Sequence, residues 1–501
     1  MIRSQISKLS KRLYSDSKFN EKLPVARYAN KKLAQVSRSR RDSQAAPRVE
    51  PSPRSFEPFP FAVTEDNKHV VLRRVIEPLI DVPYEEQLAS KETFCRNALR
   101  HLAQELYNHA TPVRLDVRRL PCHVNPIVKP PQLFDYRNKD EFSIWRGLDG
   151  KTPVVGYLVF PISKHGDSVC VEPTECRTLK RETRELCSIA QDFIVNQAKQ
   201  PVCYSLGVEG GWRRFIVRVN NKGELMLIGI LNPVNLRVKD VVEERDNFKE
   251  FMVNKCKEAG LQLKSLYYQP CPYNRCPHKN VPFELLYGDK TLYDEAGSYK
   301  FVVSPETFVH NSTCGMQSLN DSLRETVTQA FELDKMPDKP MIINVNCGAG
   351  LSSISLADLA ERVIGVDSSS QAIEDARQNV ELNKVENCDF ICSDIEIVIE
   401  KILDNHAKAN RETIVVCSVP KIGLHRYAIE ALRECSRVKK IVYMTPKVDA
   451  KGTLDNMIGL CSKGKARSQP PFAPVLATPV DVYPHIESCQ LVLALERVDL
   501  Q

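Results

Sequence analysis

The C-terminal third of the chain alternates short apolar runs with amphipathic segments, and this pattern constrains the fold more than any other feature of the sequence. The apolar runs have the length of strands and lie at Met341–Val345, Val363–Val366, Asp389–Cys392, Ile414–Cys417 and Ile441–Met444. Segments of helical periodicity lie between them, up to Ala360, at Ala372–Leu382 and at Ala428–Cys435. Strands that alternate with helices form parallel βαβ units. We therefore expect an α/β fold with a doubly wound, Rossmann-like sheet, which Cys489–Val498 extends by one strand.

The chain before residue 300 follows a different pattern. Short β-rich runs bounded by Gly, Asn and Lys occur at Val154–Phe160, Arg214–Asn220 and Leu225–Leu231. An amphipathic helix is predicted upstream of them, with an apolar face made of Leu88, Cys95, Leu99, Leu102 and Leu106. We expect a mixed α+β region over residues 62–300 and the Rossmann-like domain over residues 301–501.

Positive charge is concentrated at the start of the chain. The whole chain has 70 Lys and Arg against 63 Asp and Glu, and residues 1–54 alone hold 14 basic against 4 acidic residues. This segment is rich in Ser and has Ile2, Ile6, Leu9 and Leu13 at helical spacing, the profile of a mitochondrial transit peptide. Location in the mitochondrial matrix is therefore expected. A basic arm that contacts RNA or carries a nuclear signal is the alternative, with the protein in the nucleus or cytoplasm.

The sequence predicts no association with a membrane. No apolar run reaches the roughly 18 residues of a membrane-spanning helix.

The first predicted strand of the Rossmann-like domain ends in a glycine-rich turn, Asn346–Gly350. Ligands of doubly wound sheets bind beyond the carboxyl ends of the strands, and glycines there let a cofactor approach the backbone. Asp367 ends the second strand, 17 residues after Gly350, where a carboxylate can bind a ribose diol. The turn lacks the third glycine of a dinucleotide site and the lysine of a phosphate-binding loop. This combination favours S-adenosylmethionine as cofactor, and so a class I methyltransferase domain.

Seven motifs along the chain carry a resemblance to one family. They lie at Tyr84–Leu88, Tyr136–Lys139, Gly210–Arg213, Ser304–Phe308, Asn346–Gly350, Ile422–His425 and Val480–His485. With these motifs, residues 78–498 resemble the RNA uracil-5-methyltransferase family and, within it, the animal mitochondrial branch. The resemblance implies S-adenosylmethionine as methyl donor, uridine C5 as the methylated atom, and tRNA or mitochondrial rRNA as the RNA partner.

The resemblance also implies where the catalytic groups should stand. In the family, a cysteine thiolate adds to uracil C6, the resulting enolate takes the methyl group at C5, and a carboxylate removes the C5 proton. The nucleophile position falls on Met444, the general-base position on Gln490, and the acid after the fourth strand on Ser418. None of these side chains has the expected chemistry. Cys417 and Cys489 are the nearby thiols that remain as substitutes.

The cofactor site is predicted from the same resemblance together with the turn. The family's cofactor-binding glutamine falls on His310, and its asparagine two residues later falls on Ser312. The predicted cofactor-binding residues are His310, Asn346, Cys347, Gly348, Gly350, Leu351, Asp367, Asp394 and Ser418.

Two of the motifs combine aromatic rings with cations, which suits stacking on bases and neutralising phosphates. The predicted RNA-binding residues are Tyr136, Arg137, Asn138, Lys139, Trp212 and Arg213. Cys271, Cys276 and His278 are not followed by a second ligand pair at zinc-finger spacing, so no metal site is predicted.

Three functions follow from these observations. The first is a working uridine C5-methyltransferase. The second is a non-catalytic member of the family that binds RNA and assists its folding or assembly, because the nucleophile and base positions hold Met444 and Gln490. The third, a methyltransferase that acts on another atom without covalent addition, still needs a base.

Overall fold

The computed structural model describes residues 63–109, 111, 120–159, 168–274, 281–333, 338–405, 412–462 and 469–498. The predicted targeting segment, residues 1–54, lies outside the described residues. The described residues belong to one compact unit of the chain, residues 60–501. Among their helices, none has both the length and the apolar character needed to cross a membrane.

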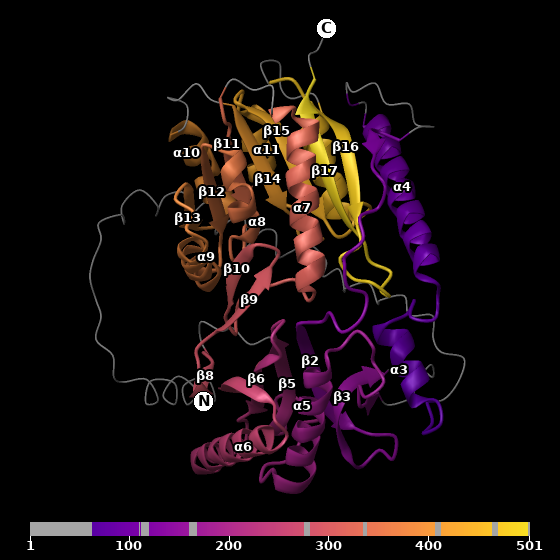
Figure 1. Ribbon diagram of the computed structural model, residues 1–501, viewed down its shortest axis with the longest axis vertical. Coiled ribbons are helices and arrows are strands. Elements are labelled where there is room, and N and C mark those ends of the chain that lie inside the picture. The colour runs from indigo at the N-terminus through magenta and orange to yellow at the C-terminus, as the bar shows by residue number, and fades with distance from the viewer. Residues whose placement is uncertain are drawn as a thin grey trace, which may run out of the picture. The chain divides into compact units, whose positions relative to one another are not determined.

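The C-terminal part of this unit is built on a sheet of eight strands within the described residues (Figure 1). In spatial order the strands are β1 (His123–Val124), β16 (Phe472–Val480), β17 (Gln490–Arg497), β15 (Val438–Thr445), β14 (Thr413–Ser418), β11 (Met341–Val345), β12 (Arg362–Asp367) and β13 (Cys388–Cys392). Strands β11 to β15 are parallel, and β17 runs antiparallel to β15 and β16. The strand order reverses at β11, which pairs with β12 and β14. The predicted doubly wound α/β fold is confirmed.

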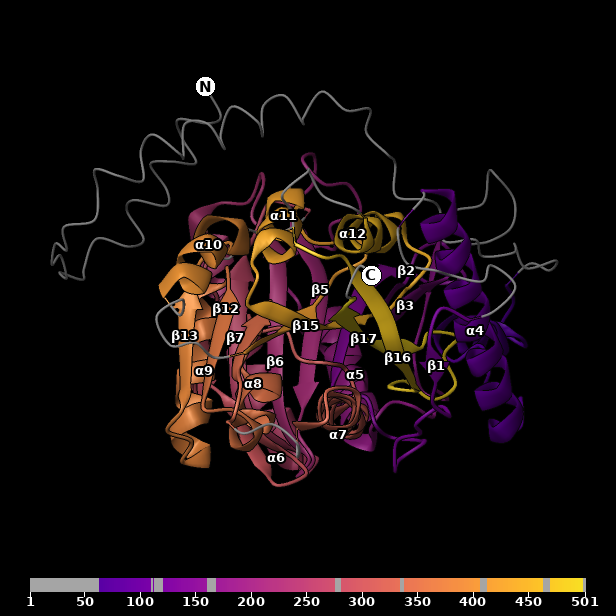
Figure 2. The same cartoon turned by 90° about the horizontal axis from the view of Figure 1, so that it is seen from above.

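Helices cover both faces of this sheet (Figure 2). On one face lie α7 (Thr313–Ala330), α8 (Leu351–Ser355), the 3₁₀ turn η3 (Ala357–Leu359) and α9 (Ser370–Asn383); on the other lie α4 (Tyr84–Asn108), α10 (Ile395–Asn405), α11 (Arg426–Glu434) and α12 (Lys451–Cys461). Successive strand residues point to opposite faces. Val416 and Met444 therefore pack with α7, while Cys417 and Tyr443 pack with α11 and α12.

Strand β16 was not expected from the sequence. Two prolines, Pro474 and Pro479, weaken its strand pattern because proline cannot donate a ladder hydrogen bond. In the structure Pro474 lies at a register shift between β16 and β17, where the ladder is already irregular. Burial of nearly the whole strand provides the stabilisation that local propensity lacks.

A second sheet of seven strands forms most of the N-terminal part within the described residues. Its spatial order is β4 (Val169–Val171), β3 (Pro153–Val159), β2 (Lys139–Arg146), β5 (Gly211–Val219), β6 (Glu224–Asn232), β7 (Gln262–Pro270) and β8 (Glu284–Gly288). Associated helices are α3 (Lys68–Ile76), α5 (Arg181–Asp192), the π-helix η1 (Phe193–Gln197) and α6 (Val238–Glu258). Phe215 stacks on Phe248 of α6, so this face of the sheet is covered by helices. This is the predicted mixed α+β region.

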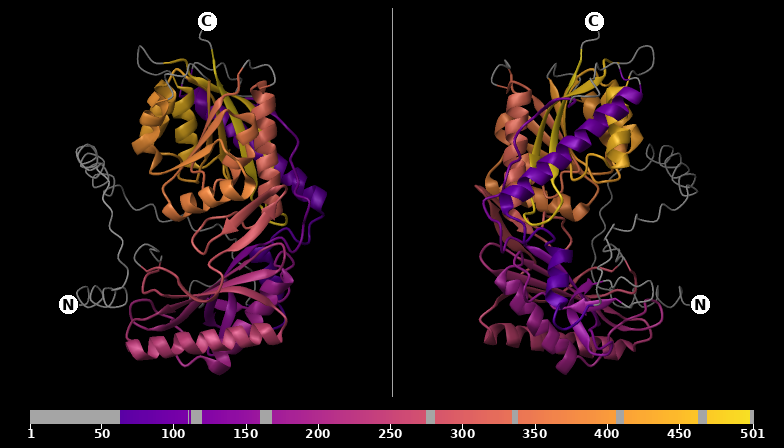
Figure 3. Two further views of the ribbon diagram at one scale, coloured as in Figure 1. Left: turned by 60° about the vertical axis from the view of Figure 1, so that its left-hand side comes forward. Right: turned by 90° about the vertical axis from the view of Figure 1, so that its right-hand side faces the viewer.

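The predicted boundary at residue 300 does not separate the two parts in space. Helix α4 packs Leu99, Leu102 and Leu106 into the core of the eight-stranded sheet, although it precedes the second sheet in the chain (Figure 3). Strand β1 likewise pairs with β16, with His123 opposite Leu476. A hairpin of β9 (Leu292–Ala296) and β10 (Tyr299–Val303) connects the second sheet to α7.

Candidate functional site

The turn after β11 has the backbone conformation that a cofactor-binding turn needs. Asn346, Gly348 and Gly350 all have positive φ, of 55°, 54° and 80°. A Cβ on Gly350 would lie 2.8 Å from the Phe390 ring and 3.0 Å from Ala376 Cβ, so only glycine fits there. The turn thus leads directly into the N-terminus of α8 at the carboxyl edge of the sheet.

Asp367 holds this turn from the end of β12. Its Oδ2 accepts a 2.9 Å hydrogen bond from the Gly348 N–H, and its Oδ1 accepts one of 2.9 Å from the Ser369 N–H. Asn346 Nδ2 donates to the Ser418 carbonyl at 3.0 Å, which joins the turn to β14. A carboxylate oxygen has two acceptor lone pairs, so Asp367 can hold the turn and still accept from a ribose hydroxyl.

Two of the predicted cofactor residues, Cys347 and Leu351, have side chains that pack inside the protein. The Cys347 thiol is buried beside Phe390, and burial raises its pKa well above the usual range. Leu351 is buried with Val309 and Met316. Both side chains point into cores, and the Cys347 N–H donates to the Val366 carbonyl at 3.1 Å. Asp394 stands immediately before α10, with its carbonyl accepting from the Ile397 N–H.

The three positions implied as catalytic come together at the carboxyl edge of the sheet. Ser418 pairs with Met444 across β14 and β15. Thr445 pairs with Leu491 across β15 and β17, which places Gln490 one residue beyond the end of that ladder. The fold therefore places these three positions at one edge of the sheet, with the side chains of Ser, Met and Gln.

Met444 is a core residue in this structure. Its side chain is 5% exposed and packs with Val416, Val442 and Val492. Its carbonyl accepts a 2.9 Å hydrogen bond from the Val419 N–H, which fixes the strand end. A thioether cannot form a thiolate, so this position cannot supply the nucleophile.

Two other thiols, Cys417 and Cys489, are buried near this strand end. Cys417 points to the opposite face of the sheet from Met444, and burial raises its pKa to about 12. The pKa of Cys489 is raised well above its usual range by a hydrogen bond with Cys95 and by burial. Cys489 Sγ lies 3.3 Å from the Val480 carbonyl. Both groups are thiols at neutral pH, and nucleophilic attack needs the thiolate.

His310 lies in the segment between β10 and α7, beside the turn. Val309 packs with Leu351 of α8, and the His310 carbonyl accepts from Asn138 Nδ2 at 2.9 Å. Its ring Nδ1 lies 3.0 Å from the Tyr483 hydroxyl. Burial lowers the pKa of His310 to about 4, so the imidazole is neutral at pH 7. The Tyr483 contact was not foreseen, although Tyr483 lies within the motif Val480–His485.

Ser312 acts as the N-cap of α7. Its hydroxyl accepts a 3.0 Å hydrogen bond from the Gly315 N–H. An N-cap hydroxyl satisfies an otherwise unpaired helix donor. The residue at the family's asparagine position therefore has a structural partner of its own.

The structure corrects the RNA-binding assignment of the two aromatic residues. Trp212 is 0% exposed, and its Nε1 donates to Glu244 Oε1 at 2.6 Å. Tyr136 is 2% exposed and donates its hydroxyl hydrogen to the Pro484 carbonyl at 2.9 Å. A ring without an accessible face cannot stack on a base, so the prediction for these two side chains is wrong.

Three of the predicted polar residues also have internal partners. The Arg137 guanidinium pairs with buried Asp140 at 2.7 Å. Asn138 donates to Thr313 Oγ1 at 2.9 Å in addition to the His310 carbonyl. Arg213 donates to the Cys271 and Tyr273 carbonyls at 3.1 and 2.7 Å. These three side chains therefore have internal partners that already account for part of their hydrogen-bonding capacity.

Accessible cations remain on the face of β2 and β5 opposite the helices. Lys139 is partly exposed and pairs with Glu141 at 2.8 Å, and Arg214 lies 3.6 Å from the same carboxylate. Near the end of β2, Arg146 stacks over the Tyr204 ring at 4.4 Å, and Trp145 packs edge-on against that ring. This cation–aromatic group was missed because its members are separated in sequence.

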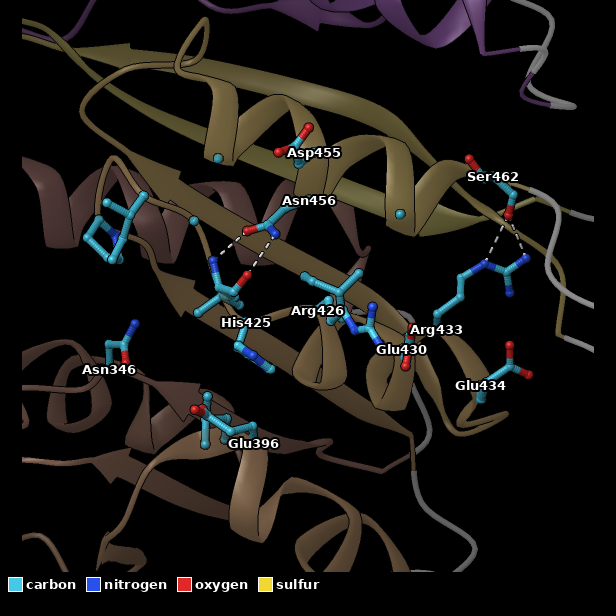
Figure 4. A pocket seen from close by; sticks show the side chains of 18 residues that line it. Asn346, Glu396, His425, Arg426, Glu430, Arg433, Glu434, Asp455, Asn456 and Ser462 are labelled. Atoms are coloured by element: carbon cyan, nitrogen blue, oxygen red, sulfur yellow. Dashed lines mark hydrogen bonds between the residues drawn. The ribbon is translucent and has the colours of Figure 1, made fainter. Parts of the chain in front are cut away.

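A pocket of about 1280 Å³ opens beside the turn (Figure 4). Asn346, Glu396 and His425 lie around one end of it, and α11 and α12 line the rest. Asn456 fixes the loop after β14 by bonding to both the Leu424 N–H, at 2.6 Å, and the Leu424 carbonyl, at 3.0 Å. Of the predicted cofactor residues, only Asn346 lines this pocket.

Within the described residues, no group of three or more His, Cys, Asp or Glu side chains is arranged to hold a metal ion. Cys276 and His278 of the cysteine-rich motif lie outside the described residues.

Comparisons with known proteins agree with the fold and the turn. Residues 338–425 match the family model described as "Methyltransferase domain", which makes this chain a protein with a methyltransferase domain. The chain is 32% identical to tRNA (uracil-5-)-methyltransferase homolog B of Danio rerio, over 85% of this chain and 86% of that protein. The homolog B of Homo sapiens is 30% identical, over 85% and 84% of the two chains. The chain therefore belongs to the S-adenosylmethionine-dependent tRNA (uracil-5-)-methyltransferase family, as predicted.

A solved structure shows the same fold. The tRNA (uracil-54, C5)-methyltransferase of Pyrococcus abyssi, in complex with S-adenosyl-L-homocysteine, superimposes with a TM-score of 0.55 at 20% identity. The match covers 82% of this chain and 83% of that one, so it includes both sheets.

Proposed function

We propose that this protein binds RNA and S-adenosylmethionine but does not methylate uridine C5 by the covalent route of its family. The observation that carries the proposal is the core packing of Met444 at the end of β15. The position that should present a thiolate to the base instead contributes an apolar side chain to the interior.

The chemistry at the other strand ends supports this proposal. Uracil C5 is a poor nucleophile until a thiolate has added to C6. The C5 proton must then pass to a base, and the neutral amide of Gln490 does not accept it as a carboxylate would. Cys417 and Cys489 remain protonated at neutral pH because of their raised pKa values. Both the first and the last step of the covalent route therefore lack their groups.

Cofactor binding is supported by the turn. Gly348, Gly350 and Asp367 keep the conformation and hydrogen bonds described above. When bound, the cofactor would supply a methyl sulfonium group. Asp367 would accept from its ribose, and the turn would border its amino-acid moiety.

RNA binding is supported by partly exposed cations on β2 and β5. Lys139 and Arg214 offer cations for phosphates, and near the end of β2 the Arg146 guanidinium lies over the Tyr204 ring with Trp145 edge-on to it. The family relatives carry tRNA in their names, so tRNA is the first RNA to test and mitochondrial rRNA the second.

The test is incubation of the purified protein with unmodified tRNA, mitochondrial rRNA and methyl-labelled S-adenosylmethionine. We expect no label in 5-methyluridine, together with measurable binding of RNA and of S-adenosylhomocysteine. A Met444→Cys, Gln490→Glu double variant tests for recovered transfer, and Met444→Ser, Gln490→Glu is its thiol-free control. Label in 5-methyluridine with the native protein would overturn the proposal.

We also propose a mitochondrial location. It is supported by the basic, Ser-rich composition of residues 1–54, which leaves 56 basic and 59 acidic residues in the rest of the chain. Deletion of residues 1–54 should abolish import into mitochondria and leave the RNA affinity of the purified remainder nearly unchanged. A large loss of affinity would mean that the segment itself binds RNA.

A further inference from the structure

Three side chains form a stack where the loop between β16 and β17 meets the segment before β2. The Arg177 guanidinium lies over the Phe134 ring, 4.2 Å from its centroid. Phe134 in turn stacks on His485, with ring centroids 4.8 Å apart and planes 20° from parallel. His485 is 3% exposed, whereas Arg177 belongs to the exposed residues. This Arg177 stack therefore runs from the interior to the surface, where it ends in a guanidinium group.

The main chain of Arg177 is fixed beside Phe134. The Arg177 carbonyl accepts a 2.9 Å hydrogen bond from the N–H of Asp135, the residue after Phe134. The next residue, Thr178, donates its N–H to Glu77 Oε1 at 2.8 Å and its hydroxyl hydrogen to the same oxygen at 2.9 Å. These bonds must break before the main chain can carry Arg177 away from the ring.

His485 is held at the inner end of the stack. Its carbonyl accepts from the Leu79 N–H at 3.0 Å, and its own N–H donates to Gln87 Oε1 at 3.1 Å. Burial lowers the pKa of His485 to about 4, so the ring is neutral at pH 7 and does not repel the Arg177 cation. The stack is thus a fixed support for a planar group placed on its outer face.

The guanidinium of Arg177 differs from those of its neighbours in its lack of an internal partner. Arg184 pairs with Asp135 at 3.4 Å, and Arg137 pairs with Asp140 at 2.7 Å. Within the described residues, the Arg177 guanidinium has neither an ion pair nor a hydrogen bond. One face of its plane lies against Phe134, which leaves the other face for a ligand. Unpaired RNA bases stack on guanidinium planes of this kind.

A second accessible cation follows at the start of α5. Arg181 is the first residue of this helix, and its side chain is 71% exposed. Its distances to Glu182 and Glu185 are 3.9 and 3.6 Å, and such exposed pairs contribute little. A nucleotide has a base for the stacking face and a phosphate for the cation. A carboxylate of a protein partner would instead bind the N–H edge of the guanidinium and would not need the ring beneath it.

We propose that Arg177, supported by Phe134 and His485, stacks on an unpaired base of the bound RNA, while Arg181 neutralises a neighbouring phosphate. This inference names the feature of the RNA that the protein recognises, and it rests on the RNA binding of the proposed function. Stacking contacts no base edge, so the site selects an unpaired nucleotide whatever its base.

The test compares two probes with the full-length protein: a stem–loop oligoribonucleotide and a fully paired RNA duplex of the same number of nucleotides. Arg177→Lys keeps the charge and removes the plane. We expect it to weaken stem–loop binding by about 5- to 10-fold and duplex binding by less than about 2-fold, with an unchanged dependence on salt. The control is Arg362→Lys, which should change neither affinity, because Arg362 pairs at the surface with Asp389.

A second measurement shows whether the lost contact is with a base. Stem–loops in which one loop nucleotide at a time lacks its base should include a position that weakens wild-type binding by the same factor. Removal of that base should have no further effect in Arg177→Lys, since the two changes delete one contact. Equal losses for stem–loop and duplex, or additive losses at every position, would overturn the proposal.

The same titrations separate this inference from the proposed function. If the wild type bound both probes and Arg177→Lys changed neither affinity, the stacking role would fail while RNA binding would stand. If the wild type bound neither probe, both would fail.

Discussion

The turn after β11 and the ends of β14, β15 and β17 belong to one sheet edge. They differ in how far their residues match the chemistry that the resemblance implies for them. The turn keeps its glycines, its positive φ values and its Asp367 hydrogen bonds. The strand ends keep their register and burial, while Ser418, Met444 and Gln490 lack the groups for covalent catalysis. Cofactor binding depends largely on backbone shape, whereas the reaction depends on particular side chains. The proposed function, cofactor binding without the covalent reaction, follows from this difference.

The largest effect is expected for the loop between β16 and β17, which lies beside the strand ends and contains Asp481. The test is whether this loop is needed for the stability of the fold. Lys91→Met removes the partner of Asp481, which is completely buried. Breaking a buried ion pair costs roughly 3–5 kcal/mol of unfolding free energy. We expect a loss of this size in urea denaturation. The control is Lys139→Met, since Lys139 pairs at the surface with Glu141. Equal stability of the two variants would show that the loop before β17 is not structurally required.

Met444, near the end of β15, provides the second test of the strand ends. Met444→Ala leaves a cavity in the core beside α7 and should lower the unfolding free energy by roughly 2–5 kcal/mol. Met444→Leu conserves the volume and should cost less than about 1.5 kcal/mol. Thermal denaturation of both variants measures the difference. A neutral Met444→Ala would mean that this side chain is not packed as a core residue.

Asp367 tests the turn. Asp367→Ala removes acceptors for the Gly348 and Ser369 N–H groups and for a ribose, and should weaken S-adenosylhomocysteine binding about 10- to 100-fold in calorimetry. Asp389→Ala, on the neighbouring strand, loses only a surface pair with Arg362 and serves as the control. Ser418→Ala should stay close to the wild type, because Asn346 bonds to the Ser418 carbonyl and not to its hydroxyl. Equal losses in all three variants would contradict the contrast between the two regions.

The free energy of unfolding should also depend on pH. Burial lowers the pKa of His310 and of His485 to about 4 in the folded protein, against about 6.5 in the unfolded chain. Below pH 6.5 the unfolded state binds more protons at these groups, so the stability they contribute is complete above pH 6.5 and decreases as pH falls toward 4. The unfolding free energy of His310→Gln should fall less steeply than that of the wild type over this range. Parallel curves would contradict the lowered pKa.

Much of the eight-stranded sheet was predictable, because short apolar runs that alternate with helical segments indicate strands that are buried on both faces. The runs at residues 341–345 and 414–417 match β11 and β14 to within a residue at each end. Gly348 and Asp367 were also predictable, since a turn and a strand end are local features. The partners of Tyr136 and Trp212 were not, because Pro484 and Glu244 are distant in sequence. Motifs of aromatic and basic residues do not distinguish a ligand surface from an internal contact.

Helix α4 connects the start of the unit to its end. Lys91 and Asp481, which form a buried ion pair, are separated by 390 residues. Contacts of such long sequence separation form late, because the entropy of closing the intervening loop must be overcome first. During synthesis, the apolar face of α4 is complete long before β16 and β17 exist to cover it. The nascent chain therefore carries α4 through the synthesis of about 390 further residues before the strands that cover it exist, and the eight-stranded sheet is complete only once β17 has been made.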